Sequence, residues 1–144
     1  MRYFTPQEAN DFIPALREAF GQIGRDRFEL LQILKELEAE GSDPAELDAQ
    51  PVADDLPEPQ RQKRLRAKQI MARIRNIVGE LQAHGLLVKR LDGLVDFRSR
   101  RGDRPVFLCW RKGEDRIEHW HELTSGAESR RPVDELFKKP ALLN

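Results

Sequence analysis

The residues best suited to chemistry gather in one stretch, LCWRKGEDRIEHWHEL, which runs from Leu108 to Leu123. It holds both tryptophans, the single cysteine and two of the three histidines of the chain. Nucleophilic, metal-ligating and acid–base side chains are denser here than anywhere else in the sequence. The stretch is therefore the first place to look for a reactive or ligand-binding site.

Alternation along this stretch predicts a β-hairpin that turns at KGED, because neighbouring side chains of a strand point to opposite faces. With that turn, one mostly apolar face collects Val106, Leu108, Trp110, Ile117, His119, His121 and Leu123. The other face collects Phe107, Cys109, Arg111, Glu118, Trp120 and Glu122. We expect the first face to meet the helices, which places both histidines in the core or at its rim.

Two histidines at positions i and i+2 of a strand, His119 and His121, could ligate a metal with Glu114 as third ligand. The alternative is that they are hydrogen-bonded core residues, and we favour it because the ligand set is incomplete. We predict that His121 hydrogen-bonds to Glu114 or Asp96, since an unpaired imidazole on an apolar face would be costly. No metal and no cofactor are expected.

The other reactive groups have ordinary explanations beside the chemical ones. Cys109 could act as a nucleophile with a histidine base, but the predicted alternation separates it from the histidines and favours packing as a small hydrophobe. Glu118 and Glu122 could form an acid–base pair, whereas nearby arginines favour cross-strand charge pairing. Glu114 follows a glycine in the turn and could point into a cleft.

The composition excludes several classes of protein. The 144 residues carry 25 basic and 25 acidic side chains, so no net charge attracts nucleic acid or an acidic membrane. The basic run RQKRLRAKQIMARIR lacks aromatic stacking platforms, and acidic residues before it balance its charge. One cysteine allows no internal disulfide. With no signal segment and no apolar span, we expect a cytoplasmic protein without nucleic-acid or membrane partners.

The N-terminal part, residues 1–40, is predicted to be a long helix. Thr5, Pro6 and Glu8 form a helix start with a capping box, and Pro14 predicts a break near residues 10–14. Apolar residues then recur at alternating steps of three and four, interrupted by Arg27.

A proline-rich acidic segment, residues 41–60, is predicted to be a mobile connector. A second helix is expected over residues 58–85, with Gly85 as its C-cap. Ile70, Ile74, Ile77 and Leu81 should pack on the first helix in an antiparallel hairpin.

The period changes to alternation after residue 85. Residues 86–123 predict an antiparallel meander of about four strands with a tight turn at Asp92–Gly93, and residues 124–144 a loop, a short helical turn and a tail. The fold class is therefore α+β, a single domain of residues 1–144 in which a long helical hairpin packs on a small sheet.

Several short motifs together resemble a family. RYFTPQEAN, GLVDF, LCWRKGE and WHEL followed by Gly126 and Arg130 are similar to a bacterial family catalogued as domain of unknown function 2203, over nearly the whole chain. The resemblance implies no activity. It directs attention to a polar cluster, although TSGAESRR departs from the family pattern around Gly126 and Arg130. The candidate site residues are Asp96, Glu114, His121, Glu122, Arg130, Trp110 and Trp120.

Two classes of function follow. The first is a non-catalytic domain that binds a small molecule or a protein and forms a homodimer through its helices. The second is a small hydrolytic or metal-assisted enzyme that uses His121 with Glu114 and Glu122. The first is favoured because the sequence assembles no nucleophile–base pair and no complete set of metal ligands.

Overall fold

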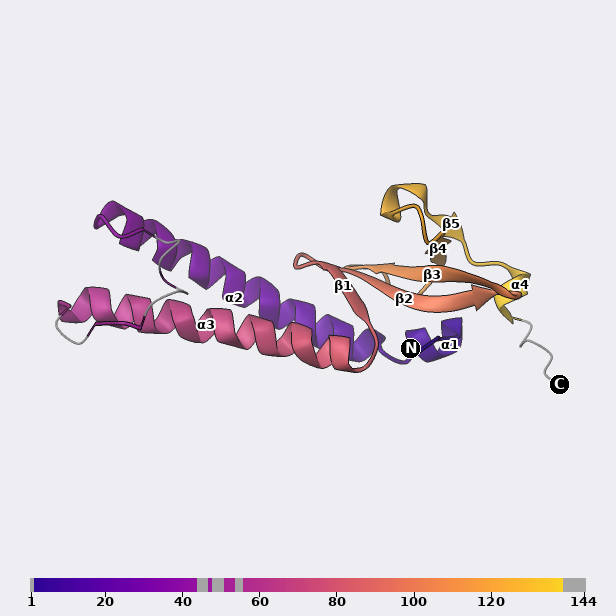
Figure 1. Cartoon of the computed structure of the whole chain (residues 1–144), viewed down its shortest axis with the longest axis horizontal. Helices are drawn as coiled ribbons and strands as arrows, with labels where there is room; N and C mark the ends of the chain where they lie inside the picture. The colour runs from indigo at the N-terminus through magenta and orange to yellow at the C-terminus, as the bar shows by residue number, and fades with distance from the viewer. Residues whose placement is uncertain (1, 44–46, 48–50, 54–55, 139–144) are drawn as a thin grey trace. The chain divides into compact units, whose positions relative to one another are not determined.

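The computed structural model describes residues 2–43, 47, 51–53 and 56–138. Helices α1 (Pro6–Asn10), α2 (Ile13–Ala39) and α3 (Glu58–Ala83) precede a β-sheet, and α4 (Glu135–Lys138) follows it (Figure 1). The described chain forms two compact units, residues 21–78 and the remainder. The predicted α+β class is confirmed.

The start of the helical region follows the sequence prediction. Thr5 and Glu8 form the capping box, in which the Glu8 N–H donates to Thr5 Oγ1 and the Thr5 N–H donates to Glu8 Oε1. The helix then breaks at Asp11 and Phe12 and restarts as α2, with Pro14 in its first turn. The break predicted from Pro14 is confirmed, because proline is tolerated in a first turn but not inside a helix.

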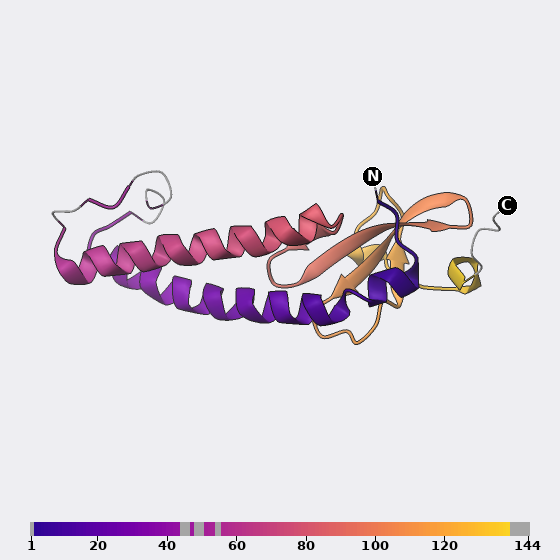
Figure 2. The same cartoon turned by 90° about the horizontal axis from the view of Figure 1, so that it is seen from below.

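Ion pairs show that α2 and α3 run antiparallel within the unit of residues 21–78. Arg73 on α3 binds Asp26 on α2, Arg66 binds Glu29, and Lys63 near the start of α3 reaches Glu40 just beyond the end of α2. Figures 1 and 2 both show the two helices side by side along this stretch. The predicted helical hairpin is thereby confirmed.

The apolar seam of α2 differs from its prediction at one position. Arg27 is exposed, and the neighbouring Asp26, only 2% exposed, takes the inward place. Arg73 satisfies the Asp26 carboxylate with two hydrogen bonds, and Gln22 donates a third. The seam is thus interrupted by a paired carboxylate, because a buried charge is tolerated where it is neutralised and hydrogen-bonded.

The far end of the hairpin holds a small apolar cluster of Leu37, Leu47 and Ala67. Leu47 belongs to the segment predicted as a mobile connector and is only 2% exposed, so this segment supplies one apolar anchor. Residues 44–46, 48–50 and 54–55 of the connector lie outside the described residues, and its mobility stays a prediction.

The end of α3 confirms the predicted C-cap. Gly85 has φ +93°, a left-handed conformation that glycine adopts without strain. The Leu86 N–H donates to Leu81 O, and the Gly85 N–H donates to Gln82 O. These two hydrogen bonds form a Schellman motif, which ends the helix and turns the chain into β1 (Leu87–Arg90).

Within the described residues the sheet has five antiparallel strands in the order of the sequence. The strands after β1 are β2 (Leu94–Arg101), β3 (Arg104–Arg111), β4 (His119–His121) and β5 (Arg131–Pro132). The meander predicted over residues 86–123 is present. The segment after it, predicted as loop and tail, adds β5 and a 3₁₀ turn over Ala127–Ser129 before α4. Residues 139–144 of that tail lie outside the described residues.

The register of the last large hairpin differs from the prediction. Cys109 pairs with His119, Leu108 with Trp120, and Phe107 with His121. The predicted turn at KGED was wrong, because the connection spans residues 112–118 and shifts the pairing by one position. A shift of one residue moves every side chain of a strand to the other face, so both histidines join the face of Cys109.

The apolar face of the sheet carries Val95, Phe97, Val106, Leu108, Trp110 and Trp120, all buried. Phe20 of α2 packs on Trp110 with ring centroids 5.7 Å apart, and Phe4 packs on Phe97 at 5.2 Å. This core fixes β2, β3 and β4 from one side. The opposite side of the same strands is therefore left for polar groups.

Candidate functional site

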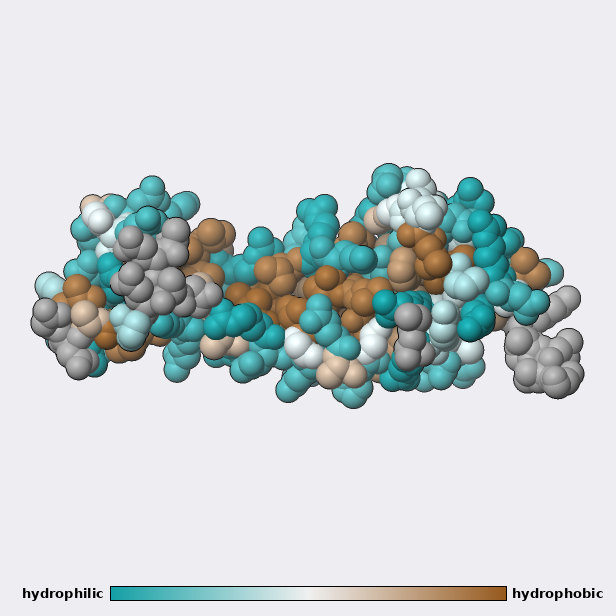
Figure 3. Space-filling view, viewed as in Figure 1, coloured by the Kyte–Doolittle hydropathy of each residue, from teal (hydrophilic) through white to brown (hydrophobic). Residues whose placement is uncertain are grey.

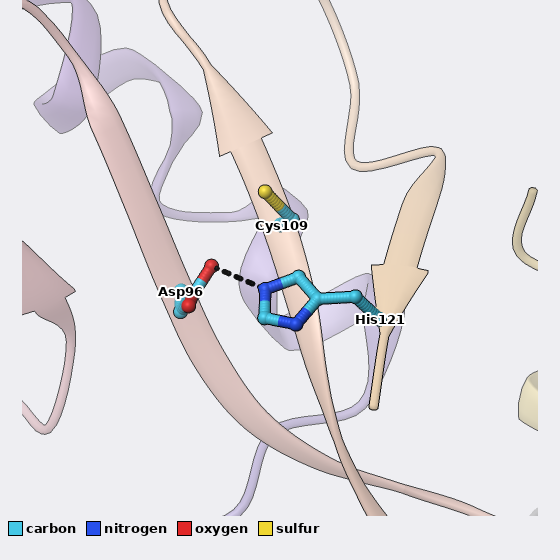
Figure 4. A group of neighbouring side chains, drawn as sticks. All are labelled: Asp96, Cys109 and His121. Carbon is cyan, nitrogen blue, oxygen red and sulfur yellow. Dashed lines mark hydrogen bonds and ion pairs between the residues drawn. The ribbon is translucent and has the colours of Figure 1, made fainter. Parts of the chain in front are cut away.

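The polar face of the sheet brings three side chains from adjacent strands together. Asp96 of β2, Cys109 of β3 and His121 of β4 point toward one another in Figure 4, and all three are buried. Their ligating atoms lie within 4.8 Å of one another. The register of the strands makes this cluster: Asp96 pairs with Cys109, and His121 lies on the same face, two residues along β4 from the partner of Cys109.

Hydrogen bonds fix the imidazole of His121 at both nitrogens. Nε2 lies 3.1 Å from Asp96 Oδ1, and Nδ1 lies 2.9 Å from the carbonyl oxygen of Glu122. A carbonyl oxygen only accepts hydrogen bonds, so Nδ1 carries a proton. The predicted hydrogen bond between His121 and a carboxylate is confirmed for Asp96. It forms on the polar face and not on the apolar face where the sequence placed it.

Cys109 is not set up as a nucleophile. Burial, and then the negative charge of Asp96, raise the pKa of the Cys109 thiol to about 12. The thiolate is the reactive form of cysteine, so the neutral thiol that predominates at physiological pH is inert. The expected packing role fits this environment, although the thiol lies beside His121 and not away from it.

A second polar cluster joins three other residues. Arg130 Nη2 donates to Glu114 Oε2 and to His119 Nδ1, each at 2.6 Å. Glu114 Oε1 also accepts from the backbone N–H of Arg111, and the Glu114 carbonyl accepts from the indole of Trp110. These bonds tie residues 112–118 to the sheet, so Glu114 and Arg130 hold a loop in place.

The remaining predicted site residues lie elsewhere. Glu122 pairs with Arg104 at 2.8 Å. Trp110 and Trp120 belong to the apolar face, where Trp120 packs on Phe137. The structure therefore brings Asp96 and His121 together, and Glu114 and Arg130 together, but it does not group all seven residues.

A pocket of about 830 Å³ opens on the polar face beside the buried cluster. Asp96, His121 and Phe107 contribute to its wall, together with residues of the β1–β2 turn and of the segment from Leu123 to Glu128. Basic side chains at its rim come from Lys89, Arg90, Arg111 and Lys112. Sequence reasoning did not single out these basic residues as a group, because they come from two segments about twenty residues apart in the sequence.

Comparison with known families gives a match to the uncharacterized conserved protein family DUF2203 over residues 2–133. The chain belongs to this family. No curated protein and no solved structure matches the DUF2203 chain. The family match confirms the resemblance seen in the sequence motifs and carries no activity with it.

Among the residues that the structure describes, no helix is long and apolar enough to cross a membrane.

Proposed function

We propose that this DUF2203 chain is a non-catalytic binding domain that takes a small anionic molecule into the pocket on the polar face of its sheet. The observation that carries the proposal is the charge of the pocket wall. Its carboxylates are those of Asp92, Asp96 and Glu128, and each has a partner within the protein: Arg90, His121 and the backbone N–H of Gly126.

The basic side chains of the pocket wall make weaker contacts within the protein than the carboxylates do. Lys89 lies over the ring of Phe107 with its Nζ 5.9 Å from the ring centroid, and the Lys112 Nζ is 3.4 Å from the carbonyl oxygen of Phe20. Arg111 is exposed. With Asp92 and Asp96 paired to side chains and Glu128 hydrogen-bonded to a backbone N–H, these basic side chains favour a ligand that bears carboxylate or phosphate groups, which arginine binds with paired hydrogen bonds.

A panel of small carboxylates and phosphates, screened by thermal shift and then by calorimetry, tests the pocket. Arg111→Gln should weaken binding of any hit at least about tenfold, as expected for one charge-assisted contact. Arg116→Gln is the matched control, because Arg116 is exposed and does not belong to the pocket wall. Equal affinities of the two variants would contradict the proposed site.

The proposal includes a homodimer formed through the helical hairpin. Two helices cannot enclose a core between them, and Leu30, Ile33, Leu34 and Met71 are only partly buried. Phe28 and Leu31, one turn apart on α2, are 68% and 55% exposed. In Figure 3, hydrophobic side chains are exposed on the helices among hydrophilic ones. A second copy of the hairpin would cover such a surface, as in a four-helix bundle.

Sedimentation at micromolar concentration tests the dimer. Phe28→Glu with Leu31→Glu should give a monomer, whereas Gln32→Glu, which adds one negative charge at an exposed neighbour without removing an apolar side chain, should not. A monomeric wild-type protein would refute this part of the proposal. The protein would act in the cytoplasm, where a free buried thiol such as Cys109 stays reduced.

The enzyme alternative has less support, because its residues are not assembled. His121 is bound to Asp96, while Glu114 binds Arg130 and Glu122 binds Arg104. An acid–base pair needs both groups within reach of one reacting atom.

A further inference from the structure

The buried cluster on the polar face contains three different metal-ligating atoms. Asp96 offers a carboxylate oxygen, Cys109 a sulfur and His121 a ring nitrogen, and these atoms lie within 4.8 Å of one another (Figure 4). Bonds of about 2.0–2.3 Å to zinc hold the ligand atoms of a tetrahedral site roughly 3.5 Å apart. A contraction of about one ångström would therefore bring the three atoms to ligating distance.

The orientation of His121 matches that of a metal ligand. Its Nδ1–H donates to the carbonyl oxygen of Glu122, which turns the Nε2 position toward Asp96 and Cys109. Metal-ligating histidines usually donate their second ring N–H to a carbonyl or carboxylate in this way, which fixes the tautomer and the ring plane. In a neutral His121 with this tautomer, Nε2 has a lone pair that faces the carboxylate.

With this tautomer, Nε2 and the Asp96 carboxylate can share a proton, or both can bind one metal ion. In the protein alone a hydrogen bond joins Nε2 to Asp96 Oδ1, and Cys109 beside them is a buried free thiol. A divalent ion would displace these protons and be neutralised by one carboxylate and one thiolate. Coordinating thiols lose their proton to such ions outright.

The geometry points to a transition-metal site of the zinc class, with Asp96, Cys109 and His121 as its protein ligands. A mixed set of nitrogen, sulfur and oxygen suits Zn²⁺ better than the oxygen-preferring Mg²⁺ or Ca²⁺. Asp96 and His121 also belong to the pocket wall, so an ion held by these residues would lie beside the pocket. Three protein ligands leave a tetrahedral ion one position for water or another ligand.

This site replaces the two-histidine site that the sequence suggested. His119 accepts a hydrogen bond from Arg130 at Nδ1 and does not belong to the close group. The reason for expecting no metal was that the stretch supplied only two ligands on one face. The observed register adds Cys109 and Asp96 to His121, and that reason no longer holds. The inference does not depend on the proposed anionic ligand, since it concerns the ion alone.

The test is titration of tag-free, chelator-treated full-length protein with Zn²⁺ and with Co²⁺. We expect saturation at one ion per chain with micromolar or tighter affinity, and a near-ultraviolet sulfur-to-cobalt charge-transfer band that reports the Cys109 thiolate. Cys109→Ser should abolish that band and weaken Zn²⁺ binding by at least tenfold, and Asp96→Asn and His121→Gln should weaken it similarly. Circular dichroism and unfolding curves verify that each variant folds.

His119→Gln is the matched control, because His119 lies on the same face and directly opposite Cys109. It should keep both the affinity and the cobalt band. Binding only at millimolar ion, a cobalt spectrum without the thiolate band, or a loss in His119→Gln with none in Cys109→Ser would each overturn the inference.

Discussion

His121 on β4 reaches across β3 to Asp96 on β2, with Nε2 and Oδ1 3.1 Å apart and both side chains at most 4% exposed. The bond joins two strands that are not neighbours. The bond lies on the face of the sheet opposite to Phe97, Leu108 and Trp120. The His121–Asp96 hydrogen bond and the apolar core therefore contact the same three strands from opposite faces.

The first prediction concerns this pair. Asp96→Ala should lower the free energy of unfolding by about 1–3 kcal/mol, because it leaves Nε2 of a buried imidazole without its partner. Urea unfolding at neutral pH measures the loss. Asp115→Ala is the control: it removes an exposed ion pair with Arg17, which should contribute less than about 1 kcal/mol. Equal losses would mean that the buried pair adds no more than a surface one.

Much of the fold could be predicted because local signals agreed with it. The capping box at Thr5, the break before Pro14 and the C-cap at Gly85 each depend on a few adjacent residues. Helix and strand periods then fixed the order of the elements. Such features are encoded within one or two turns of chain.

The site was harder to predict because it depends on register. One misplaced turn, KGED instead of residues 112–118, sent His119 and His121 to the wrong face and separated Cys109 from them. The residue that indicates the correct register is Trp120. A tryptophan between two histidines in a half-buried strand belongs with Leu108 and Trp110 in the core, and that choice alone would have set the register.

The burial of Asp26 could not be predicted from the sequence of α2 alone. Arg27 and Asp26 are adjacent charged residues, and only the position of Arg73 on α3 decides which of them is buried. Partners far apart in sequence leave no local pattern. The basic rim of the pocket was missed for the same reason.

Cys109 gives a prediction about reactivity and alkaline pH. Because its pKa is raised from 9.0 to about 12 in the folded, metal-free chain, a disulfide reagent at pH 8 should label the metal-free protein only after unfolding. The folded state keeps the proton that the unfolded state releases above pH 9. Stability should therefore fall between pH 9 and 12 by up to roughly 1.4 kcal/mol per pH unit, relative to Cys109→Ala. A constant difference between the two proteins over this range would contradict the buried neutral thiol.

Arg73 gives a prediction about acid. Hydrogen bonds from Arg73 lower the pKa of Asp26, so the pair stabilises the fold above the ordinary aspartate pKa of 3.8 and loses this contribution as pH falls through the lower folded value. Arg73→Met should cost about 1–3 kcal/mol at pH 7, since it leaves a buried carboxylate without its cation. The difference from wild type should shrink at and below about pH 4.

Arg66→Met is the matched control for Arg73→Met. Arg66 lies two turns away on α3, and its partner Glu29 is 43% exposed, so the loss of this exposed ion pair should cost less stability than the loss of Arg73. A larger effect at Arg66 than at Arg73 would mean that Asp26 is not the buried member of this charge pattern.

Gly93 gives the last prediction, and it tests the turn that shapes one side of the pocket. Its φ is +112°, and a Cβ there would lie 2.5 Å from the Cβ of Lys112, a distance that forces the β1–β2 turn away from the end of β3. Gly93→Ala should therefore lower the free energy of unfolding by about 1–3 kcal/mol through backbone strain and the clash together.

Gly79→Ala is the control for Gly93→Ala. Gly79 lies inside α3 with nothing within 4 Å of the added Cβ, so this substitution should stabilise the chain by about 0.5–1 kcal/mol. Thermal unfolding of the two variants beside wild type should shift the midpoint in opposite directions. A Gly93→Ala protein as stable as wild type would show that the turn relaxes without cost and that the pocket wall built on it is not rigid.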